Sequence, residues 1–135
     1  MGYADCIVFL LAKASQKSQN MLKIRLKPLG LTAVQALVLE ALMEADGLTA
    51  GEIGKRLLLD NATVSGVLDR LADGDWIKKR SDAEDKRVLR VFLADRARQM
   101  EGRLMQERDA ANDEILSGFT MEERIVLKRI LRDFL

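Results

Sequence analysis

The sequence contains no histidine, and this absence excludes whole classes of function. A protein without histidine has no Ser-His-Asp or Cys-His nucleophilic site and no histidine-ligated metal site. Cysteine occurs once, at Cys6, so no internal disulfide forms and nothing indicates an oxidising compartment. The composition therefore disfavours an enzyme, and we expect no catalytic residues, no metal and no cofactor.

Proline, aromatic residues and long apolar runs are also scarce. The 135 residues contain one proline, and aromatic residues make up only 4%, a composition that favours helices over a β-sandwich. The longest early apolar run, Cys6 to Ala12, is too short to span a membrane and lacks the basic start of a signal peptide. We therefore expect one helical domain over residues 1–135, located in the cytoplasm and without a membrane partner.

The net charge of +1 conceals an uneven distribution of charged residues. Residues 1–31 carry five basic residues and one acidic residue, whereas residues 32–54 carry four acidic residues and no basic one. Residues 76–103 carry nine basic and five acidic residues, a local excess of +4. Such an element can bind an anionic partner, although a basic cluster alone is more often a solvated surface.

Apolar residues at three- and four-residue steps predict a first helix from about Ala4 to Leu26, ended by Pro28 and Gly30. Capping patterns predict where the later helices begin. The expected caps are Thr32 with Gln35, Thr49 with Glu52, Asp60, Asp95, and Thr120 with Glu123. The helix Asn61–Asp73 should bury one stripe, made of Val64, Val67, Leu68 and Leu71.

The hydrophobic period changes after this helix. β-Branched and aromatic residues predict two strands, Trp76–Arg80 and Val88–Leu93, joined by the charged loop Ser81–Arg87. The expected fold is mainly α with a small β-hairpin, and residues 32–94 form a winged helix-turn-helix lobe. The flanking helices, residues 4–30 and 95–135, carry more apolar surface than that lobe can cover, so we expect them to form a dimer interface.

Small and polar residues occupy the face of the helix Asn61–Asp73 that lies opposite the apolar stripe. Such residues let a helix approach base edges in the major groove, where Asn and Ser can hydrogen-bond and Ala can meet a thymine methyl group. The candidate DNA-binding residues on this helix are Asn61, Ala62, Thr63, Ser65, Gly66 and Arg70. The alternative is the solvent face of an ordinary helix.

The loop between the two strands places Asp85 two residues before Arg87. A carboxylate at that spacing can hold a guanidinium in one rotamer, so that less entropy is lost when the guanidinium enters a narrow groove. The residues expected to bind DNA in or beside this loop are Lys79, Arg80, Asp85, Lys86 and Arg87. Lys78 and Arg90 are further candidates for neutralising phosphates. The alternative is a mixed-charge solvated turn.

Residues 57–93 resemble the core of the MarR family of bacterial transcriptional regulators. Asp85-Lys86-Arg87 matches the family's Asp-x-Arg wing motif, which follows a recognition helix with the pattern Val64-Ser65…Asp69-Arg70-Leu71. The resemblance implies a triangular dimer with two winged lobes on DNA, in which Arg87 enters the minor groove and Asp85 orients it. Three positions depart from the usual pattern: Gly66 replaces an arginine, Asp75 replaces a glycine that has shifted to Gly74, and Ala94 replaces a threonine.

We therefore expect a sequence-specific DNA-binding transcriptional regulator, a ligand-responsive homodimeric repressor that binds a pseudo-palindromic operator in double-stranded DNA. The resemblance implies a pocket for a small-molecule effector between the outer helices and the winged lobe. The residues expected to border it are Phe9, Lys13, Gln16, Lys17 and Met43. The alternative function is a winged-helix module that binds another protein and no longer reads DNA.

Cys6 invites comparison with one branch of the family, which senses organic hydroperoxides through a first-helix cysteine. Matching VFLLAKAS to that branch places Val8, not Cys6, at the sensing position. The tyrosines that the branch uses at the start of the next helix are absent, with Ala33 and Ala36 in that stretch. No cation lies within one helical turn of Cys6 to lower its pKa, so we interpret Cys6 as a small, apolar-like residue.

Overall fold

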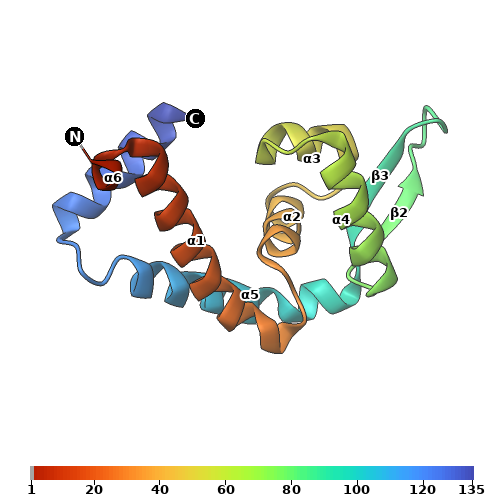
Figure 1. Cartoon of the computed structure of the whole chain (residues 1–135). Helices are drawn as coiled ribbons and strands as arrows, with labels where there is room; N and C mark the ends of the chain where they lie inside the picture. Colours follow the sequence, from red (N-terminus) through yellow and green to blue (C-terminus); the bar gives the residue numbers. More distant parts are fainter. Residues whose placement is uncertain (1) are drawn as a thin grey trace. The chain divides into compact units, whose positions relative to one another are not determined.

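The computed structural model describes residues 2–135, which form two compact units (Figure 1). The winged unit consists of residues 26–105, and the outer unit combines the residues up to 25 with residues 106–135. The division falls within helices α1 (Ile7–Leu26) and α5 (Asp95–Ile115). Within residues 2–135 no single helix has the length and hydropathy of a membrane span, whereas the bent pair 7–29 and 33–44 meets that criterion by length and composition alone.

Three short helices form the first part of the winged unit. Helix α2 (Ala33–Glu44) starts with the expected capping box between Thr32 and Gln35. Helix α3 (Ala50–Leu57) has only half of the expected box, because the Thr49 side chain accepts the amide of Glu52 but the Glu52 carboxylate lies 3.9 Å from Arg90 instead. Helix α4 (Asn61–Asp73) is capped by Asp60, as predicted, with 2.7 Å between Asp60 Oδ1 and the Thr63 amide.

The sheet has three antiparallel strands in the order β1-β3-β2, one more than the sequence predicted. Strands β2 (Ile77–Ser81) and β3 (Leu89–Leu93) form the expected hairpin, each starting one residue later than predicted. The extra strand β1 (Leu48–Thr49) pairs with β3. Gly47, at a φ of 81°, makes the turn into β1, and its amide donates to Val91 O at 2.9 Å.

The core of the winged unit is built from the inner faces of its helices and sheet. The predicted stripe of α4 is confirmed, because Val64, Val67, Leu68 and Leu71 are all buried. Buried residues of the neighbouring elements include Val38, Leu39 and Leu42 of α2, Ile53 of α3, and Ile77, Val91 and Leu93 of the sheet. One face of α4 is therefore fixed against the core, which leaves the opposite face exposed.

The start of α5 is joined to the sheet and to the end of α4 by charged side chains. Asp46 Oδ1 accepts the amide of Leu93 at 2.9 Å, and Asp46 Oδ2 accepts from Arg98 at 2.6 Å. Arg96 donates to Gly74 O and lies over the Trp76 ring, 4.1 Å from its centroid. Asp95 is the first residue of α5 rather than its cap, which corrects the sequence prediction, and its charge there still favours a helix N-terminus.

The outer unit contains most of α1, the end of α5, and α6 (Met121–Phe134). Helix α1 begins at Ile7 rather than Ala4, because residues Tyr3–Asp5 form a separate 3₁₀ turn. Helix α6 starts with the predicted capping box between Thr120 and Glu123. Arg25 of α1 pairs with Glu114 of α5 at 2.8 Å. The exposed large apolar side chains of this unit include Ile7, Val8, Leu10, Ile125, Val126, Ile130, Leu131 and Phe134.

Leu58 ends α3 in the left-handed backbone region, with a φ of 56° and its side chain 68% exposed. This conformation costs an L-residue roughly 1–2 kcal/mol, whereas glycine adopts it freely. We therefore expect Leu58→Gly to stabilise the protein by about 0.5–1 kcal/mol, after allowing for the extra entropy of glycine in the unfolded chain. Thermal denaturation at fixed protein concentration measures the change. Leu58→Ala is the matched control and should give no gain, because alanine keeps the Cβ atom; an equal gain in both variants would contradict the explanation.

Candidate nucleic-acid interface

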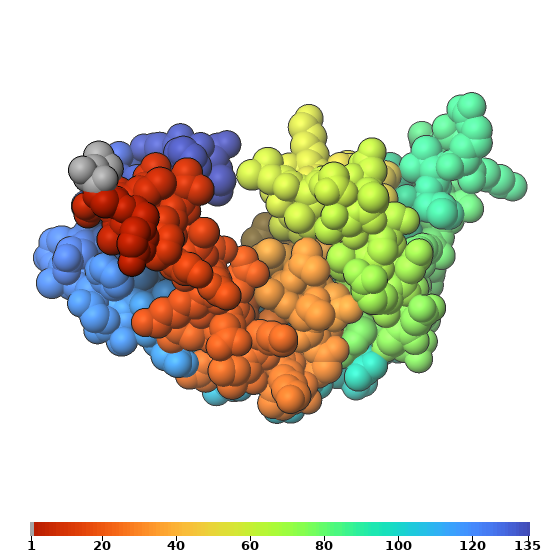
Figure 2. All heavy atoms as spheres, in the orientation of Figure 1, coloured from red at the N-terminus to blue at the C-terminus, as the bar shows by residue number. Residues whose placement is uncertain are grey.

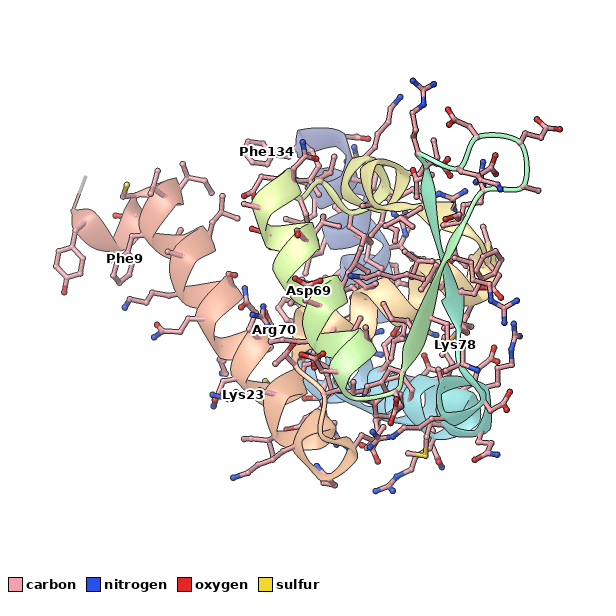
Figure 3. The ribbon with its side chains drawn as sticks, turned by 90° about the vertical axis from the view of Figure 1, so that its right-hand side faces the viewer. Phe9, Lys23, Asp69, Arg70, Lys78 and Phe134 are labelled. Carbon is pink, nitrogen blue, oxygen red and sulfur yellow. The ribbon has the colours of Figure 1, made fainter. Side chains whose placement is uncertain are left out.

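The outward face of α4 presents the residues that the sequence singled out. Asn61, Ala62, Thr63, Ser65 and Arg70 are exposed, and Gly66 is half-buried. The Arg70 guanidinium lies along the helix over Gly66, where a Cβ atom would meet two of its nitrogens at 3.6 Å. Figure 3 labels Arg70 and Asp69 on α4 and Lys78 on the sheet. A distance of 3.6 Å is an ordinary van der Waals contact, so the Arg70 side chain covers Gly66 without requiring glycine there.

The cations of the hairpin differ in how they are held. Lys79 Nζ lies 2.7 Å from Asp69 Oδ1, so this β2 residue is paired with α4, and its contact with a DNA phosphate stays a prediction. The Arg80 guanidinium lies over the Phe92 ring, 5.8 Å from its centroid. Arg90, a candidate for neutralising phosphates, donates instead to groups of its own unit, Asp82 Oδ1 at 2.6 Å and Gly47 O at 3.0 Å. These contacts give Arg90 a structural role that the sequence did not reveal.

The expected contact between Asp85 and Arg87 is present and bidentate. Arg87 Nε donates to Asp85 Oδ1 and Arg87 Nη2 donates to Oδ2, both at 3.1 Å. The Arg87 side chain is nevertheless 90% exposed. The hydrogen bonds from the guanidinium and from the Arg87 amide hold the pKa of Asp85 below its usual value. The Arg87 guanidinium is already held in one orientation by Asp85 and directed into solvent. It can therefore enter a nucleic-acid groove with little further loss of conformational entropy.

Asp82 organises the loop that carries Arg87, and sequence reasoning missed it. Asp82 Oδ2 accepts the amides of Glu84 and Asp85, at 3.2 and 3.0 Å, while Oδ1 accepts from Arg90. The Arg90 guanidinium and these amides lower the pKa of Asp82. The spacing of an Asp two and three residues before such amides is an Asx-turn signal that could have identified it. Figure 2 shows the resulting wing standing out from the rest of the winged unit.

The residues expected to border an effector pocket are divided between the two units. In the outer unit, Phe9 contacts the Tyr3 ring edge-to-face at 5.4 Å, Lys13 Nζ lies 5.9 Å from the Phe9 centroid, and Gln16 and Lys17 are exposed. Met43 is half-buried in the winged unit, and its convergence with the others stays a prediction.

The winged unit itself has an open hollow of ≈ 390 Å³, lined by Leu37, Glu40, Ala41, Glu44, Arg56 and Leu57. Among residues 2–135 no group of three acidic or cysteine side chains could hold a metal ion.

Cys6 differs from the apolar-like residue that the sequence suggested. Its side chain is exposed just before α1, where hydrogen bonds from the amides of Phe9 and Val8 lower the thiol pKa. Backbone amides at the start of a helix stabilise a thiolate as a nearby cation does, and they explain a lowered pKa in a stretch without basic residues.

We expect Cys6 to be alkylated at lower pH than a cysteine in an unfolded chain, because the helix amides stabilise its thiolate. The rate of iodoacetamide alkylation, followed by mass spectrometry between about pH 6 and pH 10, should reach half its maximum at lower pH in native buffer than in concentrated urea. The chain contains one cysteine, so the signal has a single source. If the alkylation rate depended on pH identically in native buffer and in urea, the helix amides would not stabilise the Cys6 thiolate.

The sequence is similar to a family model and to transcriptional regulators of known sequence. A model of the MarR family matches residues 29–88. The multiple antibiotic resistance protein MarR of Salmonella typhimurium is 30% identical over 127 residues, which cover 93% of this chain and 88% of that protein. The HTH-type transcriptional regulator TtmR of Methylorubrum extorquens is 35% identical over 99 residues, 72% of this chain. The match spans about half of TtmR, 49% of its length.

A solved structure gives the same result in three dimensions. The crystal structure of a cysteine mutant of MarR from E. coli, complexed with operator DNA, superposes with a TM-score of 0.87 at 28% sequence identity. The superposition covers 93% of this chain and 91% of that one. Fold and sequence similarity thus extend over nearly the whole chain.

Proposed function

Since the chain belongs to the MarR family of DNA-binding transcriptional regulators, we propose that it is a homodimeric, ligand-responsive repressor of a pseudo-palindromic operator. The observation that carries the proposal is the bidentate Asp85–Arg87 pair at the exposed tip of the wing. A two-fold dimer requires half-sites about one helical turn of DNA apart. Genome-wide selection of binding sites with the purified protein tests this requirement directly.

The two DNA-facing elements have different tasks in this proposal. Helix α4 enters the major groove, where Asn61, Ser65 and Arg70 meet base edges or nearby phosphates. The wing extends beyond it, so that Arg87 enters a minor groove whose negative potential is greatest where A·T pairs narrow it. The likeness to a relative crystallised on operator DNA supports double-stranded DNA as the partner.

The outer unit supports the dimer. Its helices leave apolar side chains exposed along their length, among them Ile7 at 64%, Ile125 at 62% and Phe134 at 74%. Soluble monomers rarely expose so many large apolar groups together, because their burial is favourable by about 25 cal/mol per Å². A second copy of the chain covers them, and residues 4–30 and 95–135 then act as dimerisation helices. The effector in this proposal is a small molecule, and the residues proposed to border its pocket are Phe9, Lys13, Gln16, Lys17 and Met43.

We expect Arg87→Ala to weaken binding to the selected operator by about 1–3 kcal/mol and to flatten the preference for flanking A·T pairs. Lys86→Ala is the matched control: it removes the same charge one residue away, so it should weaken all sequences about equally and reduce the salt slope by about one. Fluorescence anisotropy with specific and scrambled duplexes, titrated with salt, measures both effects. Unchanged operator affinity in Arg87→Ala would show that the wing is an ordinary charged turn.

We expect Ile130→Glu to prevent dimerisation, because a charge would be placed on the exposed apolar face of α6, where Ile130 is 50% exposed. The variant should aggregate or unfold, since such dimers often have no stable monomer. Lys128→Glu, a charge reversal on the same helix, is the control and should remain dimeric. Sedimentation velocity at micromolar concentration gives the oligomeric state. A well-folded wild-type monomer under these conditions would refute the dimer.

A further inference from the structure

We infer that Asp82 and Arg90 are positioning residues that determine where Arg87 is presented to DNA. The inference rests on the proposed function, because it explains how the wing arginine is oriented for a groove. It assigns Arg90 to the inside of the wing rather than to a phosphate. Three connected contacts lead from Arg90 in the sheet to Arg87 at the tip of the loop.

The first contact fixes Arg90 to the rigid part of the winged unit. Arg90 lies on β3, the central strand, where it pairs with Thr49 of β1 and Arg80 of β2 in the strand register. Its guanidinium donates to Gly47 O at 3.0 Å and to Asp82 Oδ1 at 2.6 Å, with the Glu52 carboxylate at 3.9 Å. A planar fork that reaches two acceptors at once has little freedom to rotate.

The second contact passes from Arg90 to the backbone of the loop. The Asp82 carboxylate is 20% exposed, and its other oxygen accepts the amides of Glu84 and Asp85. The Asp82 amide also donates to Val88 O at 2.8 Å, and the Val88 amide donates to Asp85 O at 3.0 Å. One carboxylate therefore links the sheet to the turn that precedes Arg87.

The third contact passes from the loop to the guanidinium. The carboxylate of Asp85, whose own amide is held by Asp82, accepts both arms of the Arg87 fork at 3.1 Å. Without Asp82 the turn loses its acceptor and its link to Arg90, so Arg87 samples more positions. That freedom must then be lost when the side chain enters the groove, which weakens binding.

The direction in which Asp82→Ala changes DNA affinity distinguishes a positioning role from a purely electrostatic one. Asp82→Ala removes a negative charge beside a polyanion, so a charge effect alone would strengthen DNA binding. The positioning role predicts the opposite, a loss of about 3- to 10-fold in operator affinity, because the loop amides lose a charge-assisted hydrogen bond. Glu84→Ala is the matched control, since it removes an exposed carboxylate from the same loop and should leave operator affinity equal or higher.

The experiment is a double-mutant cycle with Asp82→Ala and Arg87→Ala on the dimeric protein, measured by anisotropy on the selected operator. If Asp82 acts through Arg87, Asp82→Ala causes no further loss of operator affinity once Arg87 is alanine. Arg90→Lys, which keeps the charge but not the fork, should lose part of the affinity. Amide hydrogen exchange without DNA gives a second readout, and Asp82→Ala should speed exchange at Glu84 and Asp85 while the amides of α4 stay protected.

The outcomes distinguish the inference from the proposed function. If Arg87→Ala weakens binding but Asp82→Ala does not, or if the two effects add fully, the positioning role is overturned and the proposed function stands. If Arg87→Ala leaves operator affinity unchanged, both fall together. Unaltered exchange at Glu84 and Asp85 in Asp82→Ala would overturn the inference without reference to DNA.

Discussion

Val64, Val67, Leu68 and Leu71 of α4 are each at most 3% exposed, and their burial sets the rotation of this helix about its own axis. Burying each such side chain stabilises the fold by about 1.5–3 kcal/mol. A rotation by one residue, about 100°, would expose this stripe and turn charged residues such as Asp69 toward the core. The outward direction of Asn61 and Ser65 is therefore determined by side chains that are buried in the core. Any contact between this face of α4 and DNA bases depends on this one-sided packing.

The basic residues of the winged unit fall into two groups: some make contacts within the unit, and others are directed into solvent. The net charge counts both groups alike. Arg90, Arg96 and Arg98 donate to backbone or carboxylate oxygens of their own unit and join the sheet to its surroundings. Arg87 is both held by a carboxylate and 90% exposed. Residues 76–103 carry an excess of four positive charges, but some of these charges form contacts within the winged unit. The excess therefore overstates the charge that is directed into solvent. Orientation, more than the amount of charge, distinguishes this wing from an ordinary basic surface.

Local signals in the sequence predicted most of the fold, and tertiary contacts account for what they missed. The caps at Thr32, Asp60 and Thr120 could be predicted because each depends on residues within one helical turn. Strand β1 could not, because two residues carry no period and the strand exists only through its pairing with β3. The Asp85–Arg87 contact was local and therefore predictable. The partners of Arg90 lie 8 and 43 residues away in sequence, so its inward orientation required the folded structure.

The turn between α4 and β2 has its glycine at Gly74, whereas the MarR family pattern places a glycine at the position of Asp75. The structure explains this shift by one residue. A Cβ atom at Gly74 would lie 3.0 Å from Cδ1 of the buried Trp76 ring, so any other residue would force the ring to shift, and glycine avoids this crowding. The left-handed backbone falls on the next residue, Asp75, at a φ of 60°. Aspartate adopts that region more readily than most residues with a side chain, so the two requirements can be met by two residues. Because this turn joins α4 to β2, and Arg96 both donates to Gly74 O and lies over the Trp76 ring, the packing at Trp76 helps to hold the end of α4 against the hairpin.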